Sequence, residues 1–130
     1  MRRKYDLEER LIAFGQRMTE IAQTLPHTQS GKNISGQLVR SGTSAAFNYG
    51  ETQAAESRKD FIHKLGVVLK ELKECRVGLK TIQRSQMITD AEKLNPDVQE
   101  NEELVAIIGK SISTAKKNGK DKGQDSSGEN

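Results

Sequence analysis

A long amphipathic repeat in the second half of the chain constrains its fold more than any other feature. Between residues 61 and 82 the apolar side chains recur at alternating spacings of four and three residues, which places them on one face of an α-helix. They are Phe61, Leu65, Val68, Leu72, Cys75, Leu79 and Ile82. A helix that ends near Ser85 would be about 40 Å long at about 1.5 Å per residue. It needs other helices to cover its apolar face.

Two more segments with helical patterns precede this repeat. The first predicted helix begins with Asp6 as its N-cap and stops at Pro26, because the residue before a proline disfavours the helical conformation. Its apolar side chains again alternate between spacings of four and three; they are Leu7, Leu11, Phe14, Met18, Ile21 and Leu25. The second predicted helix covers about residues 30–55 and carries small residues at every fourth position, namely Gly42, Ala46, Gly50 and Ala54. We expect this row to let another helix approach closely; the alternative is that glycines merely weaken a surface helix.

A fourth predicted helix follows a connection with a short helical turn over residues 90–94. The pair Asn95-Pro96 suits a cap and a first helical position, and the helix should end near Lys117. Its expected apolar face holds Val98, Val105, Ile108, Ile112 and Ala115, with Leu104 and Ile107 beside it. Residues 119–130 contain no large apolar side chain, which predicts a disordered tail. The fold is therefore predicted to be all-α, an antiparallel up-down-up-down four-helix bundle over residues 1–118.

The composition limits how such a bundle can be stabilised. Hydrophobic residues make up 33% of the 130 residues and aromatic residues 4%, so the core is thin for the length of the chain. A thin core predicts that apolar surface is shared between subunits in a homo-oligomer. No apolar run is long enough to cross a membrane, and the basic start of the chain lacks the apolar stretch of a signal peptide. Together with a single cysteine, these features favour the cytoplasm.

The outer face of the long helix is basic. Its cations lie two residues out of phase with the apolar repeat, about 200° around the helix, and therefore point away from the core face. They are Lys59, Lys70, Lys73, Lys80 and Arg84, with Arg76 close beside them. Residues 1–84 carry 15 basic and 9 acidic side chains, a net charge of +6, whereas residues 85–130 carry 6 basic and 9 acidic, a net charge of −3. The face is interpreted either as ordinary solvated surface or as a stripe that binds phosphates. No aromatic side chain is interleaved with the cations, so base stacking is not expected.

No group of residues in the sequence predicts catalysis, a metal or a cofactor. Cys75 belongs to the apolar repeat and is interpreted as a buried thiol. Asp60 and His63 share a helix face, like the paired ligands of bundle metalloproteins, but only one such pair exists, which favours a cap and a surface residue instead. The chain has neither a phosphate-binding loop nor a nucleophile elbow. We therefore expect a protein that is not an enzyme.

Several motifs resemble those of a known family. They are Tyr5-Asp6-Leu7, Leu25-Pro26, Gln37-Leu38-x-Arg40-Ser41-Gly42-Thr43-Ser44, Asn48-Tyr49-x-Glu51, Ala55-Glu56-Ser57-Arg58-Lys59-Asp60-Phe61-x-His63-Lys64-Leu65 and Leu69-Lys70-Glu71-x-Lys73-Glu74. Over about residues 5–117 the chain resembles the bacterial four-helix bundle proteins encoded in intervening sequences of 23S rRNA genes, which are often labelled as a ribosomal protein. That family is similar in fold to the accessory variability determinant of diversity-generating retroelements, a barrel-shaped pentamer that works with a reverse transcriptase and RNA.

The resemblance implies a four-helix bundle without enzymatic activity, assembled as a homopentamer. It also implies RNA, or a ribonucleoprotein with a reverse transcriptase, as the candidate partner. The motif residues to which we assign structural roles are Arg40, Ser41, Asn48, Tyr49, Glu51, Ser57, Asp60 and Phe61. Four of them should cap and hold the junction between the second and third helices, namely Asn48, Glu51, Ser57 and Asp60. The alternative function is a structural oligomer or adaptor that binds a protein partner without nucleic acid.

Overall fold

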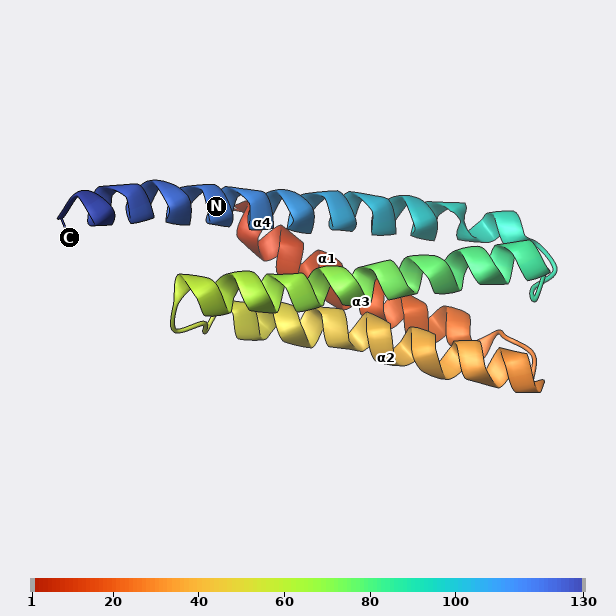
Figure 1. The fold of residues 1–130 in the computed structure, drawn as a ribbon. Coiled ribbons are helices and arrows are strands. Elements are labelled where there is room, and N and C mark those ends of the chain that lie inside the picture. The colour runs from red at the N-terminus through yellow and green to blue at the C-terminus, as the bar shows by residue number, and fades with distance from the viewer. Residues whose placement is uncertain (1, 130) are drawn as a thin grey trace.

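Four long helices make up the chain, and each runs in the opposite direction to the one before it (Figure 1). The computed structural model describes the backbone of residues 2–129 and the side chains of residues 7–119. The elements are α1 (Arg2–Gln23), α2 (Gln29–Thr52), α3 (Arg58–Ser85), the short 3-10 helix η1 (Ala91–Leu94) and α4 (Asn95–Glu129). No strand occurs in residues 2–129. The prediction of an all-α, antiparallel four-helix bundle is therefore confirmed.

Most helix boundaries follow from local signals. Thr28 caps α2, because its hydroxyl accepts a hydrogen bond from the backbone N–H of Gly31 at 3.0 Å. Helix α3 has the predicted bounds and is followed by Gln86, which adopts a left-handed conformation with φ 54°. The short helix η1 accounts for the predicted turn over residues 90–94.

The two ends of the chain differ from the sequence-based boundaries. The backbone of α1 is helical from Arg2, so Asp6 is not its N-cap; the side chain of Asp6 lies outside the described residues. Extending an existing helix costs little free energy, because each added residue gains one backbone hydrogen bond. The same reason applies to α4, which continues to Glu129 instead of ending near Lys117. The predicted disorder of residues 119–130 stays a prediction, since side chains beyond residue 119 are not described.

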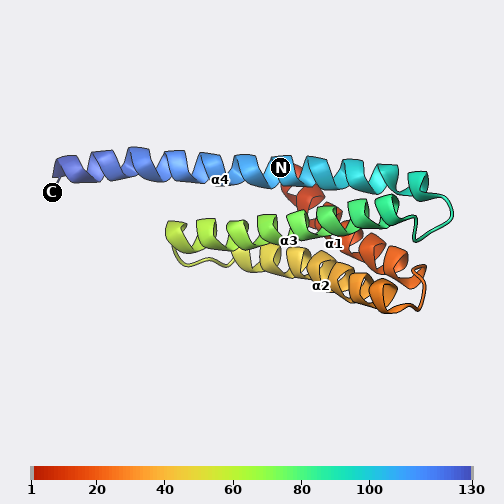
Figure 2. The same cartoon turned by 45° about the vertical axis from the view of Figure 1, so that its right-hand side comes forward.

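The apolar repeat of α3 forms the centre of the core. Six of its seven members are buried, namely Leu65, Val68, Leu72, Cys75, Leu79 and Ile82, and Phe61 packs half-buried against them. Helix α3 packs against both α2 and α4, and α1 packs against α2 and, less extensively, against α4. Figures 1 and 2 show that α1 crosses the other helices at an angle, so α1 and α4 meet over a shorter stretch.

The inner face of α4 is rotated from the predicted one, although Ile108 and Ala115 of the predicted face are buried and Val98, Val105 and Ile112 pack against the core. Its buried apolar residues are Leu104, Ile108 and Ala115, whereas Val98 and Val105 are only half-buried. Apolar side chains occupy two adjacent rows on this helix, so the pattern alone does not determine which row faces the core. Two polar residues on the inner face, Asp97 and Asn101, are buried instead of the expected valines. The side-chain amide of Asn101 donates to the carbonyl oxygen of Leu72 at 2.8 Å, which holds α4 in this rotation against α3.

The small-residue row of α2 makes one close helix crossing. A Cβ on Gly42 would lie 2.8 Å from the Cβ of Met18, and a Cβ on Gly15 would lie 2.8 Å from the carbonyl oxygen of Gly42. The prediction of close packing is confirmed at Gly42, where α1 and α2 touch. It is wrong at Gly50 and Ala54, which are exposed; a Cβ on Gly50 would meet nothing within 4 Å. Because α1 crosses α2 at an angle, only one point of the row can lie at the contact.

The junction between α2 and α3 is held by fewer groups than expected. The Ser57 hydroxyl accepts a hydrogen bond from the backbone N–H of Asp60 at 3.0 Å and caps α3. The Asp60 carboxylate does not complete a capping box with Ser57, because its side chain is one methylene shorter than the usual glutamate. Of the other two residues, Glu51 at the end of α2 does link the helices, because it accepts from Lys64 of α3 at 3.4 Å. Asn48 acts elsewhere and donates to the Ser44 carbonyl within α2 at 2.8 Å.

Substitutions at Ser57 and Asp60 should therefore differ in their effect on the free energy of unfolding. Ser57→Ala is expected to lower the free energy of unfolding by about 1 kcal/mol, the usual effect of a lost N-cap. Asp60→Ala should change it by less than about 0.5 kcal/mol, because the variant keeps the backbone N–H that Ser57 caps. It loses only exposed charge interactions, with the helix dipole and with Lys64 at 4.0 Å. Thermal unfolding of both variants at one protein concentration checks this. A larger effect from Asp60→Ala would mean that its carboxylate supports the helix start after all.

Candidate nucleic-acid interface

The predicted basic residues lie along one exposed side of α3. Every member is exposed, namely Lys59, Lys70, Lys73, Arg76, Lys80 and Arg84. We call this set the basic face. Because α3 is continuous from Arg58 to Ser85, the face is mounted on a rigid rod about 40 Å long. The structure thus brings all six predicted residues to one helix, with Arg76 at the side of the stripe.

The basic face keeps most of its positive charge. Lys70 lies 3.8 Å from Glu74 in an exposed pair four residues apart. Within the described residues, the other five cations have no carboxylate at ion-pair distance. The neighbouring carboxylates belong to the flank that faces α2, where the buried hydroxyl of Ser41 donates to Glu74 at 2.8 Å. Burial, reinforced by the charge of Glu74, raises the pKa of the Glu71 carboxyl.

Such a face can hold an extended polyanion but cannot read a base sequence. Flexible ammonium and guanidinium groups contact phosphate oxygens without regard to sequence. Recognition of single-stranded bases needs aromatic side chains as stacking platforms, and the basic face has none. Its geometry therefore favours salt-dependent contacts to a nucleic-acid backbone.

The remaining motif residues have varied surroundings. Ser41 and Tyr49 are buried on the inner side of α2, and burial, followed by the charge of Glu8, raises the pKa of the Tyr49 hydroxyl. Phe61 packs half-buried against the core. Arg40 is exposed on α2. None of these four residues belongs to the basic face.

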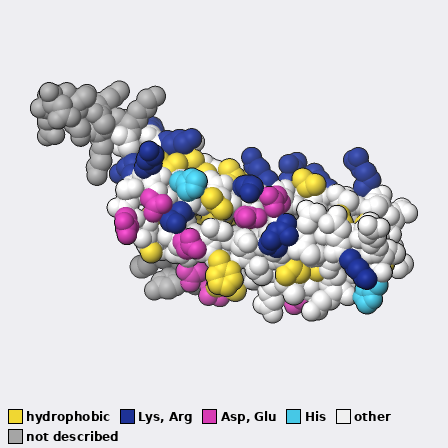
Figure 3. All heavy atoms as spheres, turned by 60° about the horizontal axis from the view of Figure 1, so that its bottom comes forward, with side chains coloured by type: hydrophobic (Ala, Val, Ile, Leu, Met, Phe, Trp, Pro, Cys, Tyr) yellow, Lys and Arg dark blue, Asp and Glu magenta, His cyan; other side chains and the backbone are white. Residues whose placement is uncertain are grey.

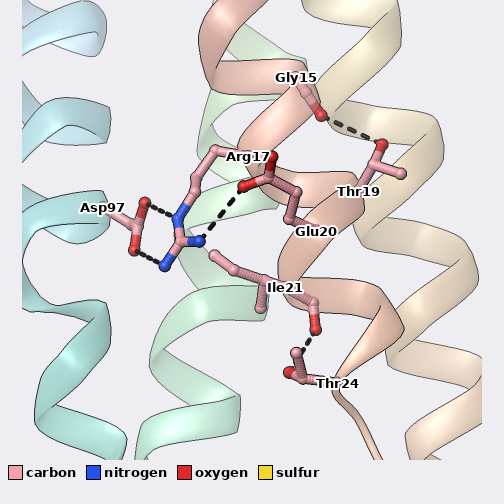
Figure 4. Close-up of polar contacts among 7 residues, drawn as sticks. All are labelled: Gly15, Arg17, Thr19, Glu20, Ile21, Thr24 and Asp97. Atoms are coloured by element: carbon pink, nitrogen blue, oxygen red, sulfur yellow. Dashed lines mark hydrogen bonds and ion pairs between the residues drawn. The ribbon is translucent and has the colours of Figure 1, made fainter.

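A polar contact between α1 and α4, which the sequence did not reveal, helps to fix the outer helix. Figure 4 shows Arg17 of α1 placed between Asp97 of α4 and Glu20 of its own helix. Its guanidinium donates to both carboxylate oxygens of Asp97 at 2.8 and 3.2 Å, and these bonds raise the pKa of Arg17. The Asp97 side chain is largely shielded from solvent, with an exposed fraction of 11%.

A second contact on the same seam is more open to solvent. Arg10 donates to Glu100 at 2.7 and 2.9 Å and to Glu103 at 2.9 Å. About 80 to 90 residues separate the partners in both contacts, so no local pattern could have signalled them.

The described residues offer little for covalent or metal chemistry. Burial, followed by the charges of Glu71 and Glu74, raises the pKa of the Cys75 thiol to about 12. A thiol with that pKa is protonated at neutral pH and is not a nucleophile. Among the side chains of residues 7–119, no three of the types His, Cys, Asp and Glu lie close enough to hold a metal ion. No helix in the described part of the chain is long and apolar enough to cross a membrane.

Comparison with known proteins identifies the family. The family model described as 23S rRNA-intervening sequence protein matches residues 3–110. The chain is also similar to the crystal structure of a protein with unknown function from the S23 ribosomal protein family of Bacteroides thetaiotaomicron. That likeness has a TM-score of 0.74 and 29% sequence identity, and covers 82% of this chain and 97% of that chain. A comparison with curated proteins gives no match. The chain therefore belongs to the family of 23S rRNA-intervening sequence proteins, in agreement with the motifs in its sequence.

Proposed function

We propose that this protein is a non-enzymatic, oligomeric four-helix bundle of the cytoplasm that associates with RNA through the basic face of α3. The observation that carries the proposal is the row of six exposed cations on one rigid helix, five of which lack a carboxylate partner within the described residues. The family description, which refers to intervening sequences of 23S rRNA, supports RNA as the polyanion. A ring of subunits, five by resemblance to the retroelement accessory protein, would repeat the face and strengthen its field.

Binding of this kind has a definite signature. Each phosphate contact releases counterions, so affinity falls steeply with salt and depends little on sequence. Lys80→Glu combined with Arg84→Glu should weaken binding to a structured RNA by at least about tenfold. It should also reduce the slope of log affinity against log salt by about 1.4 to 1.8, the value for two lost contacts. Fluorescence anisotropy between about 50 and 200 mM salt, the range in which such contacts weaken strongly, measures both quantities.

A matched control separates the basic face from total charge. Lys32→Glu combined with Lys110→Glu makes the same charge change at exposed positions of α2 and α4, outside the basic face. The control should retain nearly the full salt slope. If the two double variants bind equally, α3 has no special role in RNA binding. If wild type and both variants show no salt-dependent binding, the protein is a structural oligomer or an adaptor for a protein partner.

A further inference from the structure

Two of the three large hydrophobic side chains that the described surface exposes lie in one groove. They are Ile12 of α1 and Phe47 of α2, with exposed fractions of 47% and 75%. The groove between these helices has a volume of about 480 Å³, and Gly15, Ala46 and Gly50 line it with little side-chain bulk. An aromatic side chain with three quarters of its surface in water is typical of a contact surface. Phe47 therefore projects as an apolar knob from the rim of this groove.

The third exposed hydrophobic residue lies in a depression on another side of the bundle. Val77 of α3 is 64% exposed and lines the depression with Gly66 and Leu69; its volume is about 530 Å³. The floor is open at Gly66, where an added Cβ would meet nothing within 4 Å. Lys70 and Lys73 also line it. A phenyl ring seated there would contact aliphatic side chains and the stems and charges of two lysines.

The charges around the knob are opposite to those around the depression. Glu8 lines the groove, and Glu51 stands one helical turn beyond Phe47 with its side chain 61% exposed. Lys70 and Lys73, which line the depression, are both exposed. Glu74 lines it too and pairs with Lys70 at 3.8 Å, so the lining keeps a net charge of +1, from Lys73. In Figure 3, carboxylates are concentrated on the left of the visible face, several Lys and Arg side chains line its upper edge, and hydrophobic side chains are exposed between them.

From this complementarity we infer that the occupant of the depression is Phe47 of a second copy of the chain. The acidic residues beside the knob then approach Lys70 and Lys73 of the neighbour, two members of the basic face. The other four members, Lys59, Arg76, Lys80 and Arg84, do not line the depression and stay available for RNA. Knob and depression lie on different surfaces of the same molecule, so the contact is head-to-tail and repeats from copy to copy, closing into a ring or continuing as a filament. The inference rests on the oligomeric part of the proposed function and names the surfaces that join the subunits.

Two single substitutions and their mixture test this contact. Phe47→Glu removes the knob but leaves the depression intact. Val77→Glu places a carboxylate in the apolar lining of the depression but leaves the knob intact. Wild type should sediment as an oligomer at micromolar concentration, and each variant alone should fall to the chain mass of 14.4 kDa. An equal mixture of the two variants should form a heterodimer of twice 14.4 kDa, because one good contact remains between them. Since both residues are exposed, circular dichroism should show unchanged helix content.

Two control variants separate this contact from a general effect of changed surface charge. Ala106→Glu, an exposed change of the same charge on α4, should keep the mass of wild type. Lys80→Glu with Arg84→Glu should also keep it, because neither residue lines the depression, so loss of RNA binding and loss of assembly are separable. A monomeric wild type, an oligomeric Phe47→Glu or Val77→Glu variant, or a mixture that stays monomeric would each overturn the inference. Loss of assembly in Phe47→Glu alone would also overturn it and would indicate a symmetric contact between two α1–α2 grooves.

Discussion

Gly42→Val is expected to lower the free energy of unfolding by about 3 kcal/mol, the upper end of the usual cost of overpacking a core. A Cβ at this position would lie 2.8 and 2.9 Å from the Cβ and Cγ of Met18, and 3.4 Å from the Cα of Gly15. The Cβ of Met18 cannot rotate away, because it is fixed to the backbone of α1. Valine adds two more methyl groups, so α1 and α2 must separate along the crossing that closes this side of the core. Urea unfolding at a single protein concentration measures the change.

The matched control for this substitution should change the free energy of unfolding in the opposite direction. Gly36 lies on the same helix, is exposed, and has nothing within 4 Å of an added Cβ. Gly36→Ala should therefore raise the free energy of unfolding by about 0.5 to 1 kcal/mol, since alanine has the higher helix propensity. If Gly42→Val were no more harmful than an exposed change, the helices would not be in contact at this point.

Arg17→Ala is expected to cost about 2 to 4 kcal/mol, although Arg17 itself is 44% exposed. The cost arises from its partner: the Asp97 carboxylate is only 11% exposed and would lose two hydrogen bonds that water cannot readily replace. Leaving a buried charge without a partner destabilises more than the pair itself stabilises. Thermal and urea unfolding should show the loss, and the double variant Arg17→Ala with Asp97→Leu should recover much of it.

The neighbouring pair provides the comparison. Arg10 and Glu100 have side-chain exposures of 33% and 34%, so water can replace the bonds that a substitution removes. Arg10→Ala should therefore cost less than about 1 kcal/mol, the usual range for surface ion pairs. Equal losses from Arg10→Ala and Arg17→Ala, or no recovery in the double variant, would show that burial of Asp97 is not the cause.

Local patterns were sufficient to predict the secondary structure and much of the core. The repeat of α3 extends over six turns, and its six buried members lie where the spacing placed them. The start of α3 was equally clear, because Ser57 supplies a hydroxyl within three residues of the N–H that it caps. Both features depend on residues a few positions apart, so the sequence contains the whole signal. The exposure of the basic face followed from the same period.

The rotation of α4 was decided by tertiary structure. Two overlapping apolar rows on this helix are compatible with burial. Ile108 and Ala115 of the predicted row are buried, but Leu104, Asp97 and Asn101 are buried in place of its valines, which are only half-buried. The observed rotation lets Asn101 reach the carbonyl of Leu72 and lets Asp97 reach Arg17. These partners lie on other helices, 29 and 80 residues away along the chain.

The amino-acid sequence by itself thus determined that the chain forms four amphipathic helices, where α3 begins and ends, and that its outer face is basic. Tertiary structure alone decided that Gly42 is the point where α1 meets α2, that Asp97 and Asn101 enter the core, and that Phe47 is left exposed. The physical reason is the range of the interactions. Backbone hydrogen bonds and caps act within a turn of helix, whereas burial of a given face depends on which surface another helix presents to it.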